Sequence, residues 1–477
     1  MPYIQFLGAA GTVTGSKHLI NTSTDGPGDG LQVLVDCGLF QGQKEWRERN
    51  WQPLPLDAAA IDAVILTHAH MDHAGWIPRL VKQGFRGPVY ATPATIDLCG
   101  ILLPDSGHLQ EEEAAFHNKH KTSKHTPALP LYTFAEAQQC LAQFQPVNFG
   151  EVKQLRPDFS FRFFRAAHIL GSAMTEITLP AHDGPPRKLV FTGDIGRVCS
   201  NREAPGKVVG CGPEPAPEPP GVLVMESTYG NRAHPAADAR PELARLIREA
   251  VARGGTVVVP AFAVERTQKF LFMLKELMES GQVPRVPVHF DSPMAIEAIQ
   301  IYLKHADEFT PEARALVERY GSPLDWPGFY CDRTQQDSKK LNDARMPMII
   351  VSSSGMVTGG RILHHLMLRL PDPRNVVLFI GFQAPGTRGA IIKSGAKSLR
   401  IFSTDVPIRA QVAALEQFSD HADTPELLQW LHTFPQPPRT TYLVHGEPPA
   451  AAQLQSAIAK EMKWNVQIAQ WMQKVSV

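Results

Sequence analysis

The sequence has no excess of charge, few cysteines and no long apolar run. Its 47 Lys and Arg side chains balance 47 Asp and Glu side chains, so no overall positive field attracts a polyanion, and nucleic acid must bind through metals or local patches. Six cysteines, with no C-x-x-C pair, argue against a cysteine zinc site and suit a reducing compartment. No apolar stretch is long enough to span a membrane, and residues 1–11 lack a signal-peptide pattern. We therefore expect a cytoplasmic protein with no membrane partner.

Short apolar runs alternate with stretches of helical periodicity. Runs rich in Val, Ile and Leu predict buried strands at Leu31–Val35, Ala63–Leu66, Leu189–Phe191, Val222–Met225, Thr256–Val259, Met348–Val351, Val376–Ile380 and Tyr442–Val444. Apolar residues at three- and four-residue spacing predict helices over Pro241–Arg253, Thr267–Ser280, Ala410–Gln417 and Thr424–His432. The alternation predicts a layered α/β architecture.

Two irregular stretches interrupt this pattern. The proline-rich segment Gly210–Gly221 cannot hold regular structure, and a new series of strands and helices follows it to about residue 400. We therefore predict a discontinuous first domain, residues 1–231 and 406–477, with an inserted domain over residues 232–405. The basic, histidine-rich stretch Phe116–Lys124 has no periodicity and is predicted to be a mobile surface loop.

The strongest chemical signal lies directly after the predicted strand Ala63–Leu66. There, His68, His70, Asp72 and His73 place three imidazoles and a carboxylate within a few residues. These groups are costly to bury without partners, but in a tight loop they can converge on a cation. Histidine nitrogen and aspartate oxygen are ordinary zinc ligands. The pattern therefore predicts a metal site at a strand end.

The H-x-H-x-D-H motif resembles the metal-binding signature of the metallo-β-lactamase superfamily. Three further positions resemble that family's motifs in the order its fold presents them: Asp36 in LVDCG, His168 in AHILGS and Asp194 in FTGDIG. The resemblance implies an α/β fold, namely a four-layer αββα metallo-β-lactamase sandwich into which an α/β domain is inserted.

The rest of the chain resembles the β-CASP branch of this superfamily, whose members process nucleic acids. Glu226 in MESTYG, His421 in FSDHAD and His445 in LVHGE match its three additional motifs, and Ser352–Arg361 and Gly381–Gly389 look like further landmarks. The resemblance is closest to the group that contains the pre-mRNA 3′-end cleavage endonuclease and its prokaryotic relatives. It implies a ribonuclease that cuts single-stranded RNA, with endonucleolytic cleavage expected.

The same resemblance divides the ligands between two metal ions. His68, His70 and His168 are expected to hold one ion and Asp72, His73 and His445 the other, with Asp194 bridging them. Asp36 is expected to orient a histidine ring without binding metal. Nitrogen and oxygen ligands without sulfur favour two Zn²⁺, while Mn²⁺ or Fe stays open.

The expected chemistry is phosphodiester hydrolysis by a hydroxide that bridges the two ions. His421 is the candidate general acid, with Glu226 orienting it, alongside Asp72 and Asp194 as catalytic carboxylates. Backbone amides and hydroxyls at a strand end can receive phosphate oxygens. We therefore predict substrate contacts at Ser353, Ser354, Gly355, Arg361 and Ser419.

Three alternatives stay open at the level of sequence. A DNA nuclease of the same branch is the nearest, although a histidine at position 445 is typical of the RNA-acting members. A hydrolase of small esters or thioesters is the second, because one fold hosts many reactions. An inactive RNA-binding scaffold subunit is the third, although such members usually lose ligands. The sequence also leaves open a homodimer, the metal, the cleavage mode and the physiological RNA.

Overall fold

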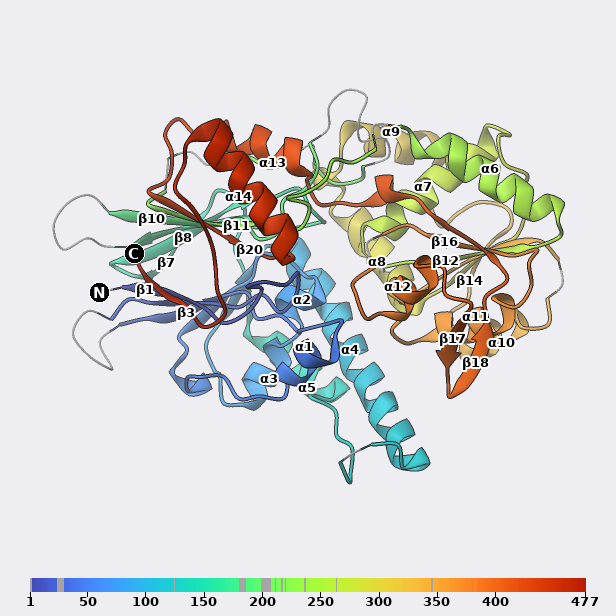
Figure 1. Ribbon diagram of the computed structural model, residues 1–477, viewed down its shortest axis with the longest axis horizontal. Coiled ribbons are helices and arrows are strands. Elements are labelled where there is room, and N and C mark those ends of the chain that lie inside the picture. Colours follow the sequence, from blue (N-terminus) through green and yellow to red (C-terminus); the bar gives the residue numbers. More distant parts are fainter. Residues whose placement is uncertain are drawn as a thin grey trace.

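The computed structural model describes residues 2–23, 30–123, 125–179, 186–198, 207–210, 212–215, 218, 220–235, 237–262, 264–344, 346–381 and 383–477. The chain forms two lobes that lie side by side, and its amino and carboxyl ends meet at the outer end of one lobe (Figure 1). That lobe is built from both ends of the chain, and the second lobe from its middle part.

Two seven-stranded sheets form the centre of the first lobe. The first sheet has the order β22 (Lys474–Ser476), β1 (Tyr3–Phe6), β2 (His18–Asn21), β3 (Gln32–Val35), β4 (Ala63–Ile65), β5 (Val89–Ala91), β6 (Phe144–Pro146). The second has the order β21 (Val466–Ile468), β20 (Thr440–Val444), β11 (Val222–Glu226), β10 (Arg187–Phe191), β9 (Ala173–Leu179), β8 (Phe159–Arg165), β7 (Val152–Arg156). Alternate residues of β8, namely Phe159, Phe161 and Phe163, are buried in a core shared with Ile4 and Phe6 of β1. The two sheets therefore pack face to face.

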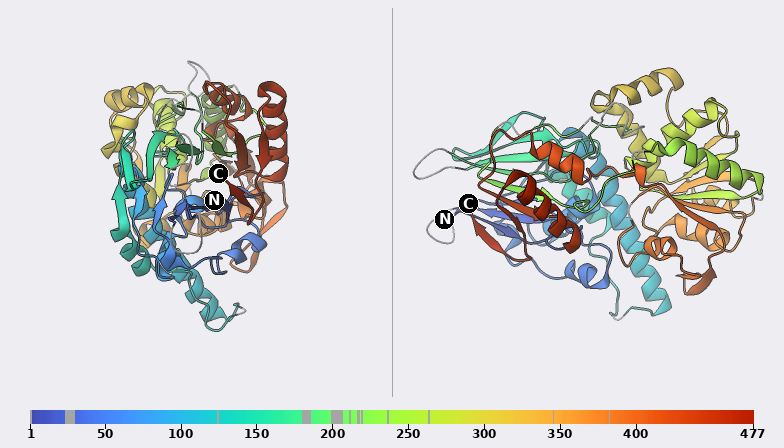
Figure 2. Two further views of the ribbon diagram at one scale, coloured as in Figure 1. Left: turned by 90° about the vertical axis from the view of Figure 1, so that its left-hand side faces the viewer. Right: turned by 45° about the horizontal axis from the view of Figure 1, so that its top comes forward.

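Helices cover the outer faces of both sheets (Figure 2). Between the strands β3 and β6 of the first sheet the chain forms α1 (Lys44–Arg49), α2 (Met71–Ala74), α3 (Ile77–Lys82), α4 (Pro93–His120) and α5 (Phe134–Cys140). The second sheet packs on α13 (Thr424–Leu431) and α14 (Pro448–Met462) through a separate apolar cluster. These layers make the four-layer αββα sandwich that the sequence predicts.

The second lobe has a parallel six-stranded sheet with helices on both faces. Its strand order is β14 (Phe329–Cys331), β13 (Val288–Asp291), β15 (Met348–Ser352), β12 (Thr256–Pro260), β16 (Val376–Phe379), β19 (Gln411–Ala414). One face packs on α6 (Ala239–Ala252), α7 (Arg266–Glu279), α8 (Pro293–Lys304) and α9 (Pro311–Tyr320). The other packs on α11 (Arg361–Arg369) and α12 (Arg388–Lys393), beside the hairpin β17 (Ser398–Ile401) and β18 (Thr404–Pro407), and α10 (Gln335–Lys340) precedes β15. Because helices cover both faces, the central strands β12, β13, β15 and β16 are almost wholly buried, whereas the edge strands β14 and β19 are partly exposed.

The eight predicted strands are confirmed, as are the helices predicted at 241–253, 267–280 and 424–432. The helix predicted over Ala410–Gln417 is wrong, because residues 411–414 form β19 at the edge of the second lobe's sheet. We therefore propose that the inserted domain extends to Ala414 and not to residue 405. The loop predicted over Phe116–Lys124 is wrong for residues 116–120, which form the last turn of α4, while Lys124 lies outside the described residues.

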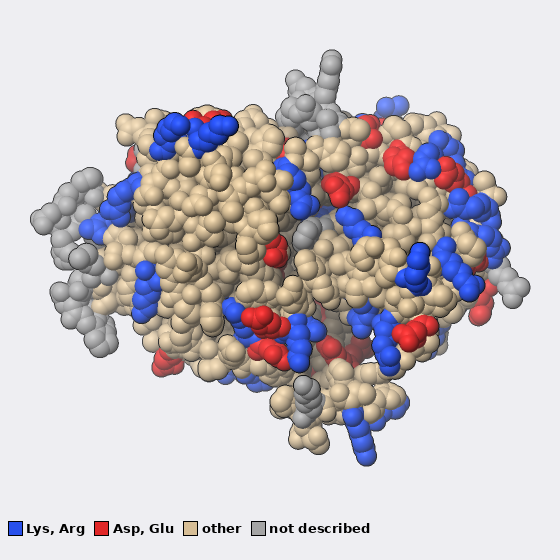
Figure 3. All heavy atoms as spheres, viewed as in Figure 1, with Lys and Arg blue, Asp and Glu red and all other residues tan. Residues whose placement is uncertain are grey.

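The described helices include none with the length and hydropathy needed to cross a bilayer. Figure 3 shows basic and acidic side chains interspersed on one face of the molecule, in agreement with the balanced composition.

Candidate metal centre

Carboxyl ends of parallel strands from both sheets supply the centre. In the first sheet β3 and β4 run parallel, and in the second sheet β10, β11 and β20 run parallel. Because the carboxyl ends of parallel strands meet at one edge, side chains just after them converge. The residues at these ends are Asp36, His68, Asp194, Glu226 and His445.

Two of these residues have positive backbone φ angles, which non-glycine residues seldom adopt. Asp36 follows β3 with φ 61° and His445 follows β20 with φ 48°. Such conformations cost about 1–3 kcal/mol and persist only where the surrounding structure enforces them. Here each one turns the chain at a strand end and directs a polar side chain into the centre.

The motif loop between β4 and α2 divides its side chains between two groups. His68 and His70 precede α2, whereas Asp72 and His73 lie in its first turn. His73 and Ala74 donate backbone hydrogen bonds to the carbonyl of His70, which starts the helix there. The change from loop to helix therefore separates the two pairs.

The first group contains His68, His70, His168 and Asp194, whose potential ligand atoms lie within 4.8 Å of one another. His70 Nδ1 is 3.1 Å from His68 Nε2 and 3.2 Å from His168 Nε2. Asp194 Oδ2 is 3.5 Å from the Nε2 atoms of both His68 and His168.

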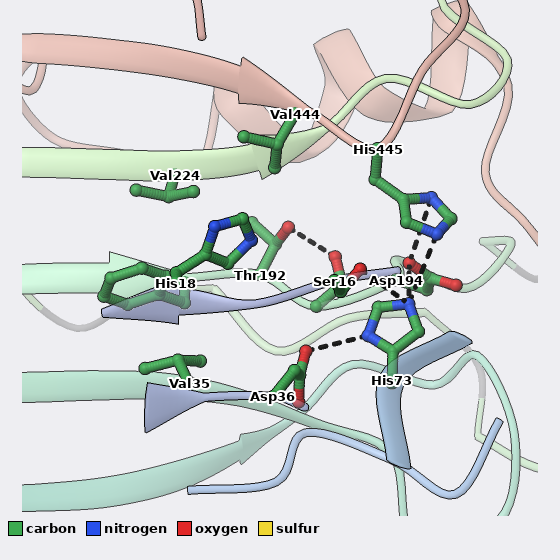
Figure 4. A pocket seen from close by; sticks show the side chains of 12 residues that line it. Ser16, His18, Val35, Asp36, His73, Thr192, Asp194, Val224, Val444 and His445 are labelled. Carbon is green, nitrogen blue, oxygen red and sulfur yellow. Dashed lines mark hydrogen bonds and ion pairs between the residues drawn. The ribbon is translucent and has the colours of Figure 1, made fainter. Parts of the chain in front are cut away.

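The second group contains Asp72, His73 and His445. The Nε2 atoms of His73 and His445 face one another at 3.3 Å, and His445 Nε2 is 3.5 Å from Asp72 Oδ2. Figure 4 shows His73 and His445 approaching from opposite sides, with Asp194 near both of them. The Asp194 Oδ1 atom is 3.3 Å from His73 Nε2 and 3.5 Å from His445 Nδ1.

These residues fit a pair of cations. Asp194 presents one carboxylate oxygen to each group, and its Oδ1 is buried without a hydrogen-bond partner. A buried carboxylate oxygen without a donor is costly unless a cation lies beside it. The facing nitrogens of His73 and His445 likewise need a shared partner, and nitrogen and oxygen donors without sulfur suit zinc.

The first group also has the protonation state that metal ligands need. Burial lowers the pKa of His68 and of His168 well below the ordinary value. Burial lowers the pKa of His70 to about 4, even though the Asp72 carboxylate opposes this shift. Neutral imidazoles offer a lone pair, so all three rings can bind a cation at neutral pH.

Asp194 and His73, unlike the three histidines above, are stabilised in their charged forms. Burial would raise the pKa of Asp194, yet the surrounding histidines, His445 foremost, hold it well below the ordinary value. Burial would lower the pKa of His73, but the Asp194 and Asp36 carboxylates raise it well above the ordinary value. Asp194 therefore stays ionised and carries a negative charge that a cation can neutralise.

Asp36 lies behind the second group. Its Oδ2 is 2.7 Å from His73 Nδ1, and it accepts hydrogen bonds from the backbone N and the hydroxyl of Thr67 at 2.8 Å and 2.9 Å. With Nδ1 hydrogen-bonded to Asp36, the Nε2 atom of His73 faces the centre.

Two threonines that the sequence analysis did not predict hold ligand rings. The Thr67 hydroxyl lies 3.0 Å from His68 Nδ1, and the Thr228 hydroxyl lies 3.0 Å from His445 Nδ1. Thr67 directly precedes His68 and Thr228 follows Glu226 by two residues, so proximity to the motifs was the available signal.

His421 and Glu226 form a pair beside the first group. His421 Nδ1 is 3.2 Å and 3.3 Å from the two Glu226 oxygens, while His421 Nε2 is 3.8 Å from Asp194 Oδ2. Glu226 also accepts a 2.6 Å hydrogen bond from the backbone N of Ile195. Burial opposes protonation of His421, but Glu226 and Asp194 raise its pKa above the ordinary value.

The predicted substrate contacts lie at different places. Ser419 is 2% exposed and its Oγ has no hydrogen-bond partner among the described residues. Ser354 Oγ is exposed and 2.9 Å from Thr358 Oγ1, and Ser353 Oγ is 2.7 Å from Ser292 Oγ.

Gly355 and Arg361 are tied to their own lobe. The Gly355 carbonyl accepts a hydrogen bond from Gln383 at 2.9 Å. The Arg361 guanidinium donates to Asp291 at 2.6 Å and to the backbone carbonyls of Asp332 and Arg333. These three hydrogen bonds use Nη1 and Nη2 of Arg361, which reduces the number of donors that it can offer to a phosphate.

Family models match three parts of the chain. Residues 26–94 match the metallo-beta-lactamase superfamily, residues 267–392 the Beta-Casp domain, and residues 405–469 the Zn-dependent metallo-hydrolase RNA specificity domain. The fold and the centre therefore define a metallo-hydrolase.

Known proteins resemble the whole chain. It is 38% identical over 442 residues to "Ribonuclease TTHA0252" of Thermus thermophilus, with 92% of each chain covered. It is 31% identical over 442 residues to "Transcription termination factor FttA" of Methanosarcina mazei, covering 91% of this chain and 66% of that protein. A protein of unknown function from Enterococcus faecalis V583 shares the fold, with a TM-score of 0.51, 12% identity and 100% of both chains covered. The chain belongs to the metallo-β-lactamase superfamily, in its β-CASP branch.

Proposed function

We propose that this protein is a metal-dependent ribonuclease that hydrolyses phosphodiester bonds of single-stranded RNA, cutting endonucleolytically, with two Zn²⁺ ions. The observation that carries the proposal is the convergence of six ligand side chains around a seventh, the shared Asp194, beside the His421–Glu226 pair. A relative that is 38% identical and covered to 92% bears the name ribonuclease, which supports RNA as the substrate.

In this proposal His68, His70 and His168 would hold one ion and Asp72, His73 and His445 the other, with Asp194 lying between the two groups. Bound there, the ions supply an activated water near neutral pH and neutralise charge that develops on the phosphate. Asp36 and Thr67 keep the rings of His73 and His68 aimed at the centre.

His421 acts as the general acid. Its Nδ1 side is held by Glu226, so its Nε2 side faces the centre, where the leaving oxygen of RNA departs. The Glu226 charge favours the protonated ring, which is the form that can donate a proton. Glu226 is a positioning residue, because it acts through His421.

The burial of the centre favours a flexible single strand. His68 and His168 are fully buried, and His73, Asp194 and His445 are at most 3% exposed. A rigid duplex cannot bring its backbone to such a site, whereas an unpaired strand can bend into it. We propose that Ser353, Ser354, Gly355 and Ser419 contact its phosphates; Arg361 is less suited because Asp291 binds it.

Matched RNA and DNA oligonucleotides test this function. The zinc-loaded protein is incubated with end-labelled unpaired strands of one sequence, and the products are mapped on a denaturing gel. We expect internal cuts in RNA and none in DNA. Equal cutting of both strands indicates a DNA-acting enzyme, and turnover of a thioester with intact RNA contradicts the proposal.

A variant pair separates catalysis from a scaffold role. Asp72→Asn removes a charged ligand of the second group and is expected to abolish cleavage while RNA binding persists. Asp158→Asn makes the same change at an exposed turn residue and is expected to cleave like the unmodified protein. An unchanged rate for Asp72→Asn contradicts the proposed centre.

A further inference from the structure

A buried arginine of the second lobe lies next to the metal centre. Arg266 is the first residue of α7 and is 6% exposed. Its Nε lies 3.4 Å from Asp420 Oδ2, and Asp420 directly precedes His421, whose Nε2 reaches to 3.8 Å from Asp194. The guanidinium therefore lies beside the segment that carries the proposed general acid.

The Arg266 guanidinium uses few of its hydrogen-bond donors on the described residues. It offers five N–H donors in a planar fork. In the described part of the chain, its one anionic partner is Asp420, contacted through Nε, and neither Nη atom makes a hydrogen bond to these residues. A nearly buried cation with open donors is suited to bind an anion.

The local charges leave a positive excess. The Asp420 charge also acts on Lys269, a second buried cation, whose Nζ donates to the carbonyl of Gln417 at 2.9 Å. The adjacent carboxyl of Glu265 is buried, and burial together with the Asp420 charge raises its pKa to about 8. Asp420 thus contacts Arg266 and also acts on Lys269, whose pKa burial lowers to about 8. A phosphate at Arg266 would bring a second negative charge to these groups.

The surroundings hold the guanidinium in place. The Phe262 ring lies 4.4 Å from the Arg266 guanidinium carbon, a cation–π contact. At Gly381 a Cβ would come within 2.6 Å of Arg266 Nη1, so any side chain there would displace the guanidinium. The absence of a side chain at position 381 leaves room for the fork to extend.

The segment beside Arg266 borders the first ligand group. Asp420, which contacts Arg266, directly precedes His421, and the His421 ring lies 4.4 Å from the His168 ring between centroids. Arg266 is therefore linked through Asp420 to the side of the centre where His168 and His421 lie.

We propose that Arg266 is a substrate-binding residue that donates hydrogen bonds from its Nη atoms to a phosphate oxygen of RNA at the metal centre. This inference rests on the proposed function and adds to its phosphate site a cationic side chain, Arg266. Substrate binding then requires both lobes, because the ligands and the arginine come from different lobes.

The test measures RNA binding and cleavage by the zinc-loaded full chain. A 2′-O-methylated oligonucleotide, first checked to stay intact with the zinc-loaded protein, reports affinity by fluorescence anisotropy at several salt concentrations, and the unmodified strand reports kcat and KM. Arg266→Gln is expected to weaken binding about ten- to a hundredfold, as loss of hydrogen bonds to a charged group does. The salt dependence of log Kd is expected to fall by about one, with the zinc content unchanged.

Two further variants make the result decisive. Arg266→Lys keeps the charge and is expected to retain the salt dependence with a smaller loss of affinity. Arg245→Gln makes the same change on the exposed face of α6 and is expected to bind RNA like the unmodified protein. Thermal denaturation checks that each variant folds, and an unfolded Arg266→Gln leaves Arg266→Lys to decide.

The outcomes separate this inference from the proposed function. If the unmodified protein cuts RNA and Arg266→Gln keeps its affinity and salt dependence, Arg266 serves only as an ion-pair partner of Asp420 and the inference is overturned. If the unmodified protein cuts no RNA, the proposed function fails. Binding of inorganic phosphate to the unmodified protein and to Arg266→Gln then decides the role of Arg266.

Discussion

The pairing of Glu226 with His421 allows a quantitative test. Glu226 is fully buried and its oxygens lie 3.2 Å and 3.3 Å from His421 Nδ1. Replacing Glu226 with Gln removes the charge but keeps an oxygen that can accept the hydrogen bond from Ile195. The fold and the ligand groups should therefore persist.

The charge loss should lower the pKa of His421. A hydrogen bond to a charged group contributes about 1.5–3 kcal/mol, which is about a ten- to hundredfold change in an equilibrium constant. Glu226 now raises the pKa of His421, so its replacement shifts that pKa downward. A general acid works only when protonated, so the alkaline limb of the rate profile should move to lower pH.

Cleavage of an RNA oligonucleotide at saturating concentration, measured as kcat from pH 5 to 9, tests this shift. Above the pKa that His421 has in each of the two proteins, Glu226→Gln should be about 10- to 100-fold slower than the unmodified protein. The difference in rate should shrink towards acidic pH. Glu176→Gln alters another buried glutamate, paired with Arg162 on the second sheet, and should leave the limb in place. If Glu226→Gln binds zinc fully and the alkaline limb of its pH–rate profile stays in place, the assignment of His421 as the general acid is refuted.

Three other predictions follow from the same geometry. Asp36→Asn should weaken zinc binding at the His73 group about 10- to 100-fold, because the ring loses its charged hydrogen-bond acceptor; competition titration with a chelating dye checks this. Removal of zinc with a chelator should abolish cleavage and lower the midpoint of thermal unfolding, and added zinc should restore both; an unchanged midpoint contradicts the assignment, since a ligand of the native state stabilises it. Phe161→Ala should cost about 3–5 kcal/mol in the free energy of unfolding by denaturant, because Phe161 is 1% exposed between the two sheets, whereas Leu129→Ala, at 64% exposure, should cost far less.

The elements that the sequence predicted correctly have strong local signals. The buried strands contain short runs of branched residues, and the helices at 241–253 and 267–280 show regular apolar spacing. The stretch 410–417 shows similar spacing but forms β19, because pairing with β16 outweighs a weak local preference. The strand β19 also completes the sheet of the inserted domain, so we place the end of that domain at Ala414 and not at residue 405.

The sequence by itself determined the chemistry of the centre. His68, His70, Asp72 and His73 lie close together in the chain, so their donor atoms and strand-end position could be deduced without coordinates. Resemblance to known motifs singled out the distant partners, such as His445, but local patterns could not have brought them together.

Only the tertiary structure decided which side chains meet. His73 and His445 face one another at 3.3 Å because strands from opposite sheets end at one edge of the sandwich. The same packing tied Arg361 to Asp291 and placed Arg266 next to the segment of His421. Such contacts join residues far apart in the chain, and only the packing of the sheets and lobes fixes their distances.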